Sequence, residues 1–176
     1  MSEELKKYIR SIKDFPNKGI LFRDITTLLK EPEAINLVIK ELVELTFGHR
    51  IDKVVGIESR GFIFGSLLAQ KLGVGFILAR KPGKLPSETE SQTYKLEYGE
   101  DKIEIHKDAI NKGEKILLHD DLLATGGTAE ATAKLIEKLG GEVVQISFLI
   151  ELTFLKGKDK LKNYEVKSLV NYDSEE

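Results

Sequence analysis

Cysteine is absent from the 176 residues of this chain. Its absence excludes a disulfide scaffold, a Cys-ligated zinc site, an iron–sulfur cluster and every cysteine nucleophile, and it favours a reducing compartment. The longest apolar runs fall well short of the roughly 18 residues that indicate a membrane span. The charged beginning of the chain, MSEELKKYIR, also lacks the apolar core of a signal peptide. We therefore expect a soluble cytoplasmic protein.

The chain likewise lacks an excess of charge of either sign. Its 27 Lys and Arg residues nearly balance its 29 Asp and Glu residues, which leaves a formal net charge of -2. This balance argues against a nucleic-acid backbone as the main partner, so any anion site must be local. The length and the 41% hydrophobic content suit one domain over residues 1–176, which can fold without a disulfide or a bound metal.

Helices and strands alternate along the chain. Apolar residues at helical spacing predict four helices, over residues 3–13, from Pro32 to near Gly48, over 61–72 and over 127–139. Short apolar runs predict five strands, at residues 53–57, 74–79, 115–120, 143–149 and 166–170. This order predicts an α/β fold with a mainly parallel twisted sheet and helices on both of its faces.

A polar stretch follows the second of these strands. Residues 81–93, KPGKLPSETESQT, contain two prolines, one glycine and no hydrophobic periodicity, and therefore predict a long exposed loop. Loops of this length are uncommon unless they are functional. Beyond the loop, Tyr94–Tyr98 and Lys102–His106 alternate apolar and polar residues across Gly99. That pattern predicts a β-hairpin at the edge of the sheet.

The most informative stretch is residues 116–128, ILLHDDLLATGGT, which leads directly into a predicted helix. An apolar strand ends there in Asp120 and Asp121, at the carboxyl edge where open parallel sheets bind ligands. The small residues that follow offer backbone N–H groups and hydroxyls at the positive end of a helix, which together can hold a phosphate. The two carboxylates are better suited to sugar hydroxyls or a hydrated Mg²⁺. A sugar 5-phosphate satisfies both halves of the motif.

Other interpretations of this stretch start from more ordinary roles. Its glycines and threonines also suit a plain strand end and helix cap, although two adjacent acids at the end of a buried strand argue against that. Neither G-x-G-x-x-G nor G-x₄-G-K-[ST] occurs in the chain, which excludes a Rossmann fingerprint and a P-loop. On a regular strand the side chain of His119 points away from that of Asp120, so we interpret it as a packed histidine. His49 and His106 adjoin no informative motif.

The segment HDDLLATGGT resembles the signature with which type I phosphoribosyltransferases bind phosphoribosyl pyrophosphate (PRPP). The resemblance to the adenine phosphoribosyltransferases extends over nearly the whole chain. It is carried by four further segments, Phe15–Asp24, Val54–Phe62, Arg80–Pro86 and Leu96–Gly99. It divides the single domain into a small N-terminal hood over residues 1–35, a flexible catalytic loop over 81–93 and the PRPP-binding motif over 116–128. His119 departs from the family, which usually carries an aliphatic residue there.

The resemblance implies where each part of PRPP binds. The 5-phosphate is expected in the loop formed by Ala124, Thr125, Gly126, Gly127 and Thr128. The ribose hydroxyls are expected at Asp120 and Asp121. The pyrophosphate is expected against Arg60 and the backbone of Glu58 and Ser59, which in this family tend to be joined by a non-proline cis peptide. Three cations at the start of the flexible loop are expected to close over it: Arg80, Lys81 and Lys84.

The resemblance also implies the base pocket and the reaction. Backbone groups of Leu21 and Arg23 are expected to meet adenine, Phe22 to pack near its ring and Glu97 to handle its proton. The expected catalytic residues are Glu97, Arg60 and Lys84. The expected reaction converts adenine and PRPP to AMP and pyrophosphate with Mg²⁺ as cofactor. Mg²⁺ would be held mainly by PRPP and water, with Asp120 or Asp121 as a further ligand. A homodimer is expected, with no nucleic-acid or membrane partner.

Several of these residues have simpler interpretations, and two other functions compete. Taken alone, the loop cations would be a solvated charge cluster, Glu97 a solvent-facing strand residue and Ile20–Phe22 a hydrophobic anchor. The nearest enzyme alternative is a phosphoribosyltransferase for xanthine or another 6-oxopurine, whose pocket must donate to O6. The alternative of another class is a PRPP-sensing regulator that binds nucleic acid, but this chain has no room for a separate basic domain.

Overall fold

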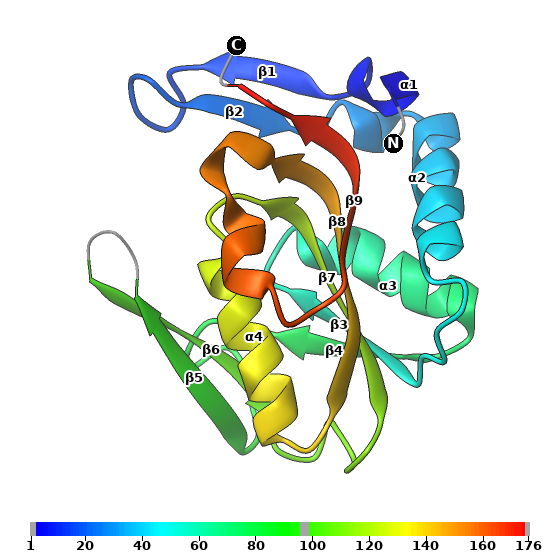
Figure 1. The fold of residues 1–176 in the computed structure, drawn as a ribbon, viewed down its shortest axis with the longest axis vertical. Coiled ribbons are helices and arrows are strands. Elements are labelled where there is room, and N and C mark those ends of the chain that lie inside the picture. Colours follow the sequence, from blue (N-terminus) through cyan, green and yellow to red (C-terminus); the bar gives the residue numbers. More distant parts are fainter. Residues whose placement is uncertain (1–2, 96–98, 175–176) are drawn as a thin grey trace.

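The computed structural model describes residues 3–95 and 99–174. Its centre is a five-stranded sheet in the order β4-β3-β7-β8-β9, and every neighbouring pair is parallel (Figure 1). The strands span Lys53–Ile57 (β3), Gly75–Ala79 (β4), Lys115–Leu123 (β7), Glu142–Leu152 (β8) and Val166–Tyr172 (β9). The parallel sheet confirms the predicted fold class. Strands β7 and β8 extend further than predicted, because their ladder continues as far as the pair Leu123 and Glu151.

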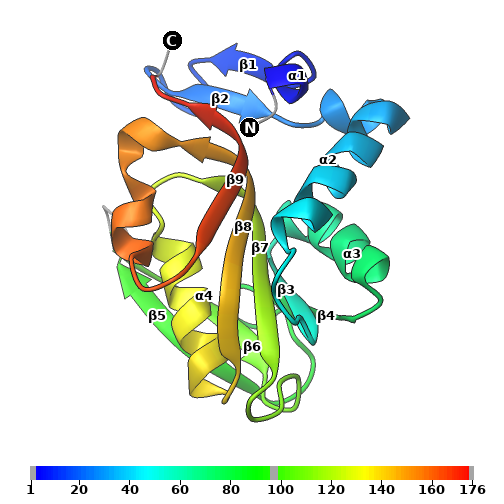
Figure 2. The same ribbon diagram turned by 45° about the vertical axis from the view of Figure 1, so that its right-hand side comes forward.

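Helices cover both faces of the sheet, as Figure 2 shows. Helices α2 (Pro32–Leu45) and α3 (Gly61–Leu72) lie on one face and α4 (Gly127–Lys138) lies on the other. The α3 helix has the predicted bounds because Gly73 ends it in the left-handed conformation, with φ +71°. None of the helices in the part of the chain that the structure describes is long and apolar enough to span a membrane.

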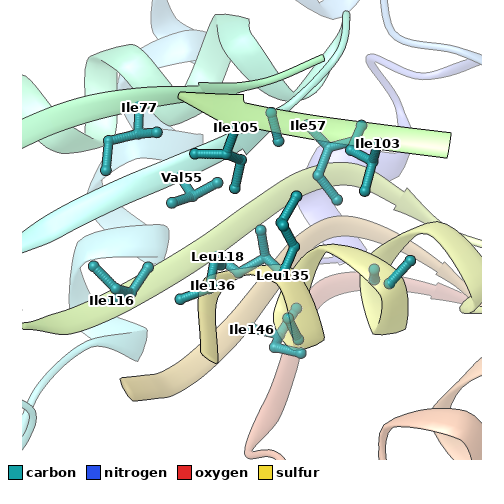
Figure 3. Close-up of a cluster of buried hydrophobic side chains, with 14 of the residues drawn as sticks. Val55, Ile57, Ile77, Ile103, Ile105, Ile116, Leu118, Leu135, Ile136 and Ile146 are labelled. Atoms are coloured by element: carbon teal, nitrogen blue, oxygen red, sulfur yellow. The ribbon is translucent and has the colours of Figure 1, made fainter. Parts of the chain in front are cut away.

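Two buried hydrophobic clusters fix the helices to the sheet. One lies between the sheet, α4 and the hairpin, and Figure 3 shows its isoleucines and leucines interdigitating. The other packs α2 and α3 against the opposite face, around Phe64 and Leu117, which are both fully buried. Alternate residues of β7 enter different clusters, since Ile116 and Leu118 face α4 whereas Leu117 faces α2 and α3. A strand buried on both faces explains the unbroken apolar run before Asp120.

The N-terminal segment differs from the prediction. Residues 3–13 do not form one helix: α1 covers only Glu3–Lys6, and Arg10–Lys13 form strand β1. This strand pairs antiparallel with β2 (Leu21–Asp24), so that Ile12 lies opposite Phe22. Cross-strand pairing therefore overrode the helical spacing of the apolar residues. The resulting hairpin lies across the carboxyl ends of the sheet strands, followed by the 3₁₀ helix η1 (Leu28–Lys30) (Figure 1).

The predicted long loop is shorter than expected. Strand β5 covers Thr89–Lys95 and pairs antiparallel with β6 (Glu100–His106), so residues 89–93 belong to the hairpin. The polar sequence of β5 hid this strand, because its pairing depends on β6. Ile103 and Ile105 of β6 are buried in the cluster beneath α4 and fix the hairpin to the domain. The predicted strand 94–98 is described only up to Lys95.

A second segment that the sequence did not predict connects β8 to β9. It consists of two short 3₁₀ helices, η2 (Thr153–Leu155) and η3 (Gly157–Leu161). Lys156 joins them in the left-handed conformation, with φ +53°. Leu161 is fully buried in the cluster beneath α4. The segment is thereby held close to the beginning of α4 (Figure 1).

Asp24 fixes the N-terminal hairpin and makes its stability depend on pH. Its buried carboxylate accepts bonds from Thr26 N at 2.8 Å and Arg10 Nη2 at 2.5 Å, and these contacts lower its pKa to about 2. The stabilisation is therefore present above the unfolded pKa near 4 and is lost as pH falls toward 2. We expect Asp24→Asn to lower the free energy of unfolding by about 1–2 kcal/mol at pH 7.

Urea unfolding at pH 7 and pH 3 measures this effect, and the difference between the two proteins should narrow at the lower pH. Asp108→Asn, at an exposed carboxylate, is the matched control and should leave stability within about 0.5 kcal/mol of the original chain. A loss for Asp24→Asn that is equal at both pH values would contradict the electrostatic account.

Candidate functional site

The carboxyl end of β7 leads into the loop predicted to hold a phosphate. Gly126 precedes α4 in the left-handed conformation, with φ +80°. Its carbonyl oxygen accepts the first bond of the helix, from Glu130 N at 2.9 Å. The N–H groups of the first turn have no partners within the helix and form its positive end. Residues 122–129 surround a cavity of about 90 Å³ together with Asp120 and Phe148. The structure thus brings Ala124, Thr125, Gly126, Gly127 and Thr128 together around one small cavity.

A close backbone contact explains the glycine at position 126. A β-carbon on Gly126 would lie 2.4 Å from the carbonyl oxygen of Gly157, and a β-carbon on Gly157 would lie 2.2 Å from that of Ala124. Both distances are far below van der Waals contact. The sequence analysis missed Gly157 because its partner is more than thirty residues away. Its position in the short KGKDK segment carries no recognisable signal.

The two carboxylates predicted to bind ribose hydroxyls lie beside this loop. Asp120 lines the cavity, and its Oδ1 accepts the backbone N–H of Asp121 at 2.8 Å. Asp121 is buried, and its Oδ2 lies 3.0 Å from Nε of Arg60 as an ion pair. Burial and the neighbouring charge of Asp121 raise the pKa of Asp120 well above its usual range. Burial also raises the pKa of Asp121, although Arg60 opposes this change.

The residues at the start of α3 place Arg60 opposite these carboxylates. The peptide bond between Glu58 and Ser59 is cis, as the family resemblance implied. A β-carbon on Gly61 would lie 2.8 Å from Oδ1 of Asp120, so only glycine lets α3 approach β7 this closely. The guanidinium of Arg60 lies 5.1 Å from the centre of the Phe22 ring, within range of a cation–π contact. Arg60 thus joins the carboxylates to the N-terminal hairpin.

Two of the three loop cations, Arg80 and Lys81, form ion pairs in this part of the structure. Nε of Arg80 lies 3.2 Å from Oε2 of Glu58, and the same oxygen accepts the N–H of Lys81 at 2.8 Å. Nζ of Lys81 lies 3.0 Å from Oδ2 of Asp101. Burial opposes ionisation of Glu58, but these donors and the charges of Arg80 and Lys84 lower its pKa overall. Lys84 is exposed and accepts a bond from Arg80 through its carbonyl oxygen.

The residues predicted to meet a base are described in part. Phe22 is half-buried and packs edge-to-face on Phe15, with ring centres 5.1 Å apart. The side chain of Arg23 is buried, donates to Oγ of Ser11 at 2.5 Å and stacks over the Tyr172 ring at 3.8 Å. Leu21 is half-buried on the same strand. Glu97 lies outside the residues that the structure describes.

His119 is buried in the sheet, as its alternation with Asp120 predicts. Its Nδ1 lies 2.9 Å from Oγ of Ser147 on the neighbouring strand β8. Burial lowers the pKa of His119 to about 4, so the ring is neutral at pH 7. It lies on the fully buried part of β7 rather than at the loop, and no described carboxylate faces it. This packing supports a structural role.

The oxygen atoms of Asp120 and Asp121 suit a hard divalent cation. Carboxylate oxygens are the protein ligands that Mg²⁺ prefers, and it usually keeps several waters and binds substrate phosphates as well. Among the described residues, no group of three or more acidic or histidine side chains could enclose a metal. Burial and the charge of Asp121 raise the pKa of Asp120 more than Arg60 lowers it, so a further cation would favour its charged form. The donors therefore fit a cation that arrives with its substrate.

Known proteins resemble this chain over almost all of its length. The pattern of the phosphoribosyl transferase domain matches residues 24–175. An adenine phosphoribosyltransferase from Christiangramia forsetii is 63% identical over 169 residues, which are 96% of this chain and 99% of that protein. The crystal structure of an adenine phosphoribosyltransferase from Thermoanaerobacter pseudethanolicus superposes with a TM-score of 0.95 at 54% identity, covering 97% of this chain and 99% of that chain.

A third relative carries ligands. The adenine phosphoribosyltransferase of Saccharomyces cerevisiae, solved with adenine and an imino-altritol bisphosphate, superposes with a TM-score of 0.89 at 43% identity. That match covers 94% of this chain and 96% of the yeast chain. All three relatives therefore resemble this chain over nearly its full length.

The contact between Gly126 and Gly157 generates a prediction about stability. Gly126→Ala places a methyl group in a left-handed conformation and against the backbone of Gly157. We expect it to lower the free energy of unfolding by about 3–5 kcal/mol. Gly113→Ala is the matched control, because Gly113 has a similar φ of +82° but no atom within 4 Å of its β-carbon position.

Gly113→Ala should lower the free energy of unfolding by only about 1–2 kcal/mol, the cost of placing alanine in a left-handed conformation. Urea denaturation of both variants measures the difference directly. Equal losses would contradict the close contact, since the two sites differ mainly in the atoms around the added methyl group.

Proposed function

The chain belongs to the adenine phosphoribosyltransferases of the phosphoribosyl transferase family, and from this we propose that it transfers the 5-phosphoribosyl group of PRPP to adenine. The products are AMP and pyrophosphate, and the reaction recovers a purine base for nucleotide synthesis. One observation supports the proposal most strongly: a neutral phosphate-sized loop closely follows two adjacent carboxylates, the half-buried Asp120 and the buried Asp121, at the carboxyl edge of the sheet. A sugar 5-phosphate requires that combination of groups.

In this proposal PRPP lies across the ends of β7 and α3. The 5-phosphate accepts bonds from the loop residues 124–128 at the beginning of α4. Asp120 and Asp121 accept bonds from the ribose 2- and 3-hydroxyls. The pyrophosphate lies near Arg60 and the backbone of Glu58 and Ser59. These groups hold C1 of the ribose between the pyrophosphate and the base.

A bound Mg²⁺ would neutralise pyrophosphate and so weaken the bond from C1 to the leaving oxygen. Asp120 and Asp121 are the residues that would hold it, directly or through water. With the metal bound, the negative charge on Asp120 gains a partner, which lowers the cost of ionising this buried acid. The same carboxylates keep the ribose hydroxyls oriented.

The protein supplies positive charge to the leaving group. Arg60 already faces the site, whereas Arg80 and Lys81 must exchange their bonds to Glu58 and Asp101 for bonds to pyrophosphate. The exposed Lys84 must move toward it as well. This exchange would close the loop over PRPP and exclude water, which would otherwise react with the ribose cation. The bond from C1 to oxygen breaks through an oxocarbenium-like transition state, and adenine N9 then forms its bond to C1 from the opposite face.

The N-terminal hairpin supplies the base pocket in this proposal. Because the side chain of Arg23 is turned toward Ser11 and Tyr172, its backbone is the part that can meet adenine, together with that of Leu21. Phe22 packs near the ring of the base. Glu97 takes part in removing the proton from the imidazole side of adenine, so that N9 can attack C1.

A panel of bases tests the proposed reaction. With PRPP and Mg²⁺, adenine should give AMP and pyrophosphate, whereas hypoxanthine, guanine and xanthine should react roughly 30- to 10⁴-fold less well, because O6 and N1 mismatch the backbone groups. Nucleotide products are identified by chromatography, and a chelator should abolish turnover. Use of a 6-oxopurine within tenfold of adenine would favour the 6-oxopurine enzyme. Binding of PRPP without turnover, but with binding of random DNA, would favour the regulator.

A substitution tests the role of Glu97 separately. Glu97→Gln keeps the size of the side chain but cannot accept the proton, so kcat should fall by about 10²–10⁴-fold while PRPP binding changes little. Glu100→Gln, three residues further along the hairpin and exposed, is the matched control and should retain its activity. If Glu97→Gln kept most of its activity, the role in proton transfer would be wrong even if adenine is the substrate.

We further propose a homodimer in the cytoplasm. Multiply charged PRPP does not cross a bilayer unaided, so the enzyme should share the compartment that supplies it. Strand β4 is an edge of the sheet, and its Leu78 is 38% exposed. A self-complementary contact along this edge would cover the Leu78 side chain. It would also bring the loop that begins at Arg80 close to the partner subunit.

Light scattering tests the assembly. The chain should have twice its monomer mass of 19.8 kDa at micromolar concentration. Leu78→Lys should shift it toward the monomer, because lysine in the contact would be desolvated without a partner. Phe47→Lys is the control, since Phe47 is 75% exposed but lies after α2, away from β4. A monomeric original chain with full activity would contradict the proposal.

A further inference from the structure

The proposed phosphate site lacks a cation among its own residues. Positions 124–128 are Ala, Thr, Gly, Gly and Thr, which offer N–H groups and hydroxyls but no charge. The nearest charged neighbours along the chain are all carboxylates, Asp120 and Asp121 before the loop and Glu130 after it, and carboxylates repel an anion. A phosphate monoester carries nearly two negative charges at pH 7. The loop therefore needs positive charge from another part of the fold.

The segment between β8 and β9 lies beside the loop. Gly157, at the beginning of η3, touches the backbone at Ala124 and Gly126. Leu161, at the end of η3, is buried in the cluster beneath α4. Both ends of this short helix are thus fixed relative to the loop, and Figure 1 shows the orange segment against the upper end of α4. A side chain between these two points has a defined position near the phosphate site.

Four lysines lie in this segment, at positions 156, 158, 160 and 162. Lys156 joins η2 to η3, and the other three differ in their partners. Nζ of Lys158 lies 2.7 Å from Oε2 of the buried Glu151, and Nζ of Lys162 lies 3.7 Å from Oδ1 of Asp159. Lys160 forms no ion pair with any residue that the structure describes. Its Nζ lies 3.8 Å from the position that a β-carbon on Gly127 would occupy, at the first residue of α4.

We propose that Lys160 binds the 5-phosphate of PRPP and supplies the positive charge that the loop lacks. The inference rests on the proposed function, since it adds one residue to the phosphate site described there. The flexible side chain of Lys160 begins at the anchored helix η3 and ends beside the N–H groups of α4. A small reorientation of its ammonium group would add a charge-assisted bond to those from the loop. Glycine at position 127 leaves room for that movement.

Calorimetric binding tests Lys160 without depending on catalysis. Ribose 5-phosphate carries the 5-phosphate but no pyrophosphate, whereas inorganic pyrophosphate lacks the 5-phosphate. Lys160→Met should weaken binding of ribose 5-phosphate and PRPP about tenfold, the usual size for one charged hydrogen bond, and leave pyrophosphate binding unchanged. Lys160→Arg should restore most of the affinity, and the effect of Lys160→Met should shrink as salt is raised. Lys162→Met is the matched control and should bind all three ligands normally.

The possible outcomes separate this inference from the proposed function. If the original chain binds ribose 5-phosphate and Lys160→Met binds it equally well, Lys160 has no role in the site and the proposed function stands. If Lys160→Met weakens pyrophosphate as much as ribose 5-phosphate, the effect is not local to the 5-phosphate and the inference is wrong. If the original chain binds neither PRPP nor ribose 5-phosphate, the proposed function fails and the inference fails with it.

Discussion

The backbone contact between Gly126 and Gly157 is the constraint on which the candidate site depends. A loop that is to present N–H groups to an anion must keep its peptide planes fixed before the anion arrives, because reorganising them would reduce the affinity. Helix α4 orients one side of the loop, and Gly157 lies against the other side so closely that neither glycine can carry a β-carbon. The segment between β8 and β9 therefore fixes the shape of the site. The motif that makes the site recognisable in the sequence lies elsewhere, at the end of β7.

Buried acids beside that loop show how binding and stability oppose each other. Asp120 and Asp121 are adjacent, and burial raises the pKa of each. Arg60 is the one positive group for which an ion pair with Asp121 is described. A core designed only for stability would avoid such a pair, since buried like charges are costly. Substrate hydroxyls can donate hydrogen bonds to these oxygens, and a cation can neutralise their charge. The free-energy cost of placing the two acids together is therefore offset when the ligands bind. Gly61 keeps α3 close enough for Arg60 to moderate that cost.

Local patterns predicted the central sheet well and the segments around it less well. Lys53–Ile57 and Gly61–Leu72 were predicted correctly because an apolar strand, a buried helix and the stop at Gly73 are all local signals. The predictions for Arg10–Lys13 and for residues 89–93 were wrong because each segment becomes a strand only through a partner elsewhere, β2 or β6. The same reason explains which residues of the candidate site could be predicted from the sequence. Asp120, Asp121 and the glycines of the loop form a contiguous motif, whereas Gly157 and Lys160 reach it only through tertiary structure. Glu97 stays a prediction.

The ion pairs of the flexible loop have a consequence for the release of product. Glu58 and Asp101 hold Arg80 and Lys81 at distances of 3.2 and 3.0 Å, so the two carboxylates act as intramolecular competitors for the cations that the pyrophosphate would use. Because they are tethered in the same fold, their effective concentration near these cations is high, on the order of millimolar or more. In the proposed reaction, opening of the loop would proceed by exchange, in which a carboxylate replaces a phosphate oxygen, so that neither cation is left without a partner. Such exchange would weaken binding of the product but make its departure faster, which would favour repeated turnover over tight retention.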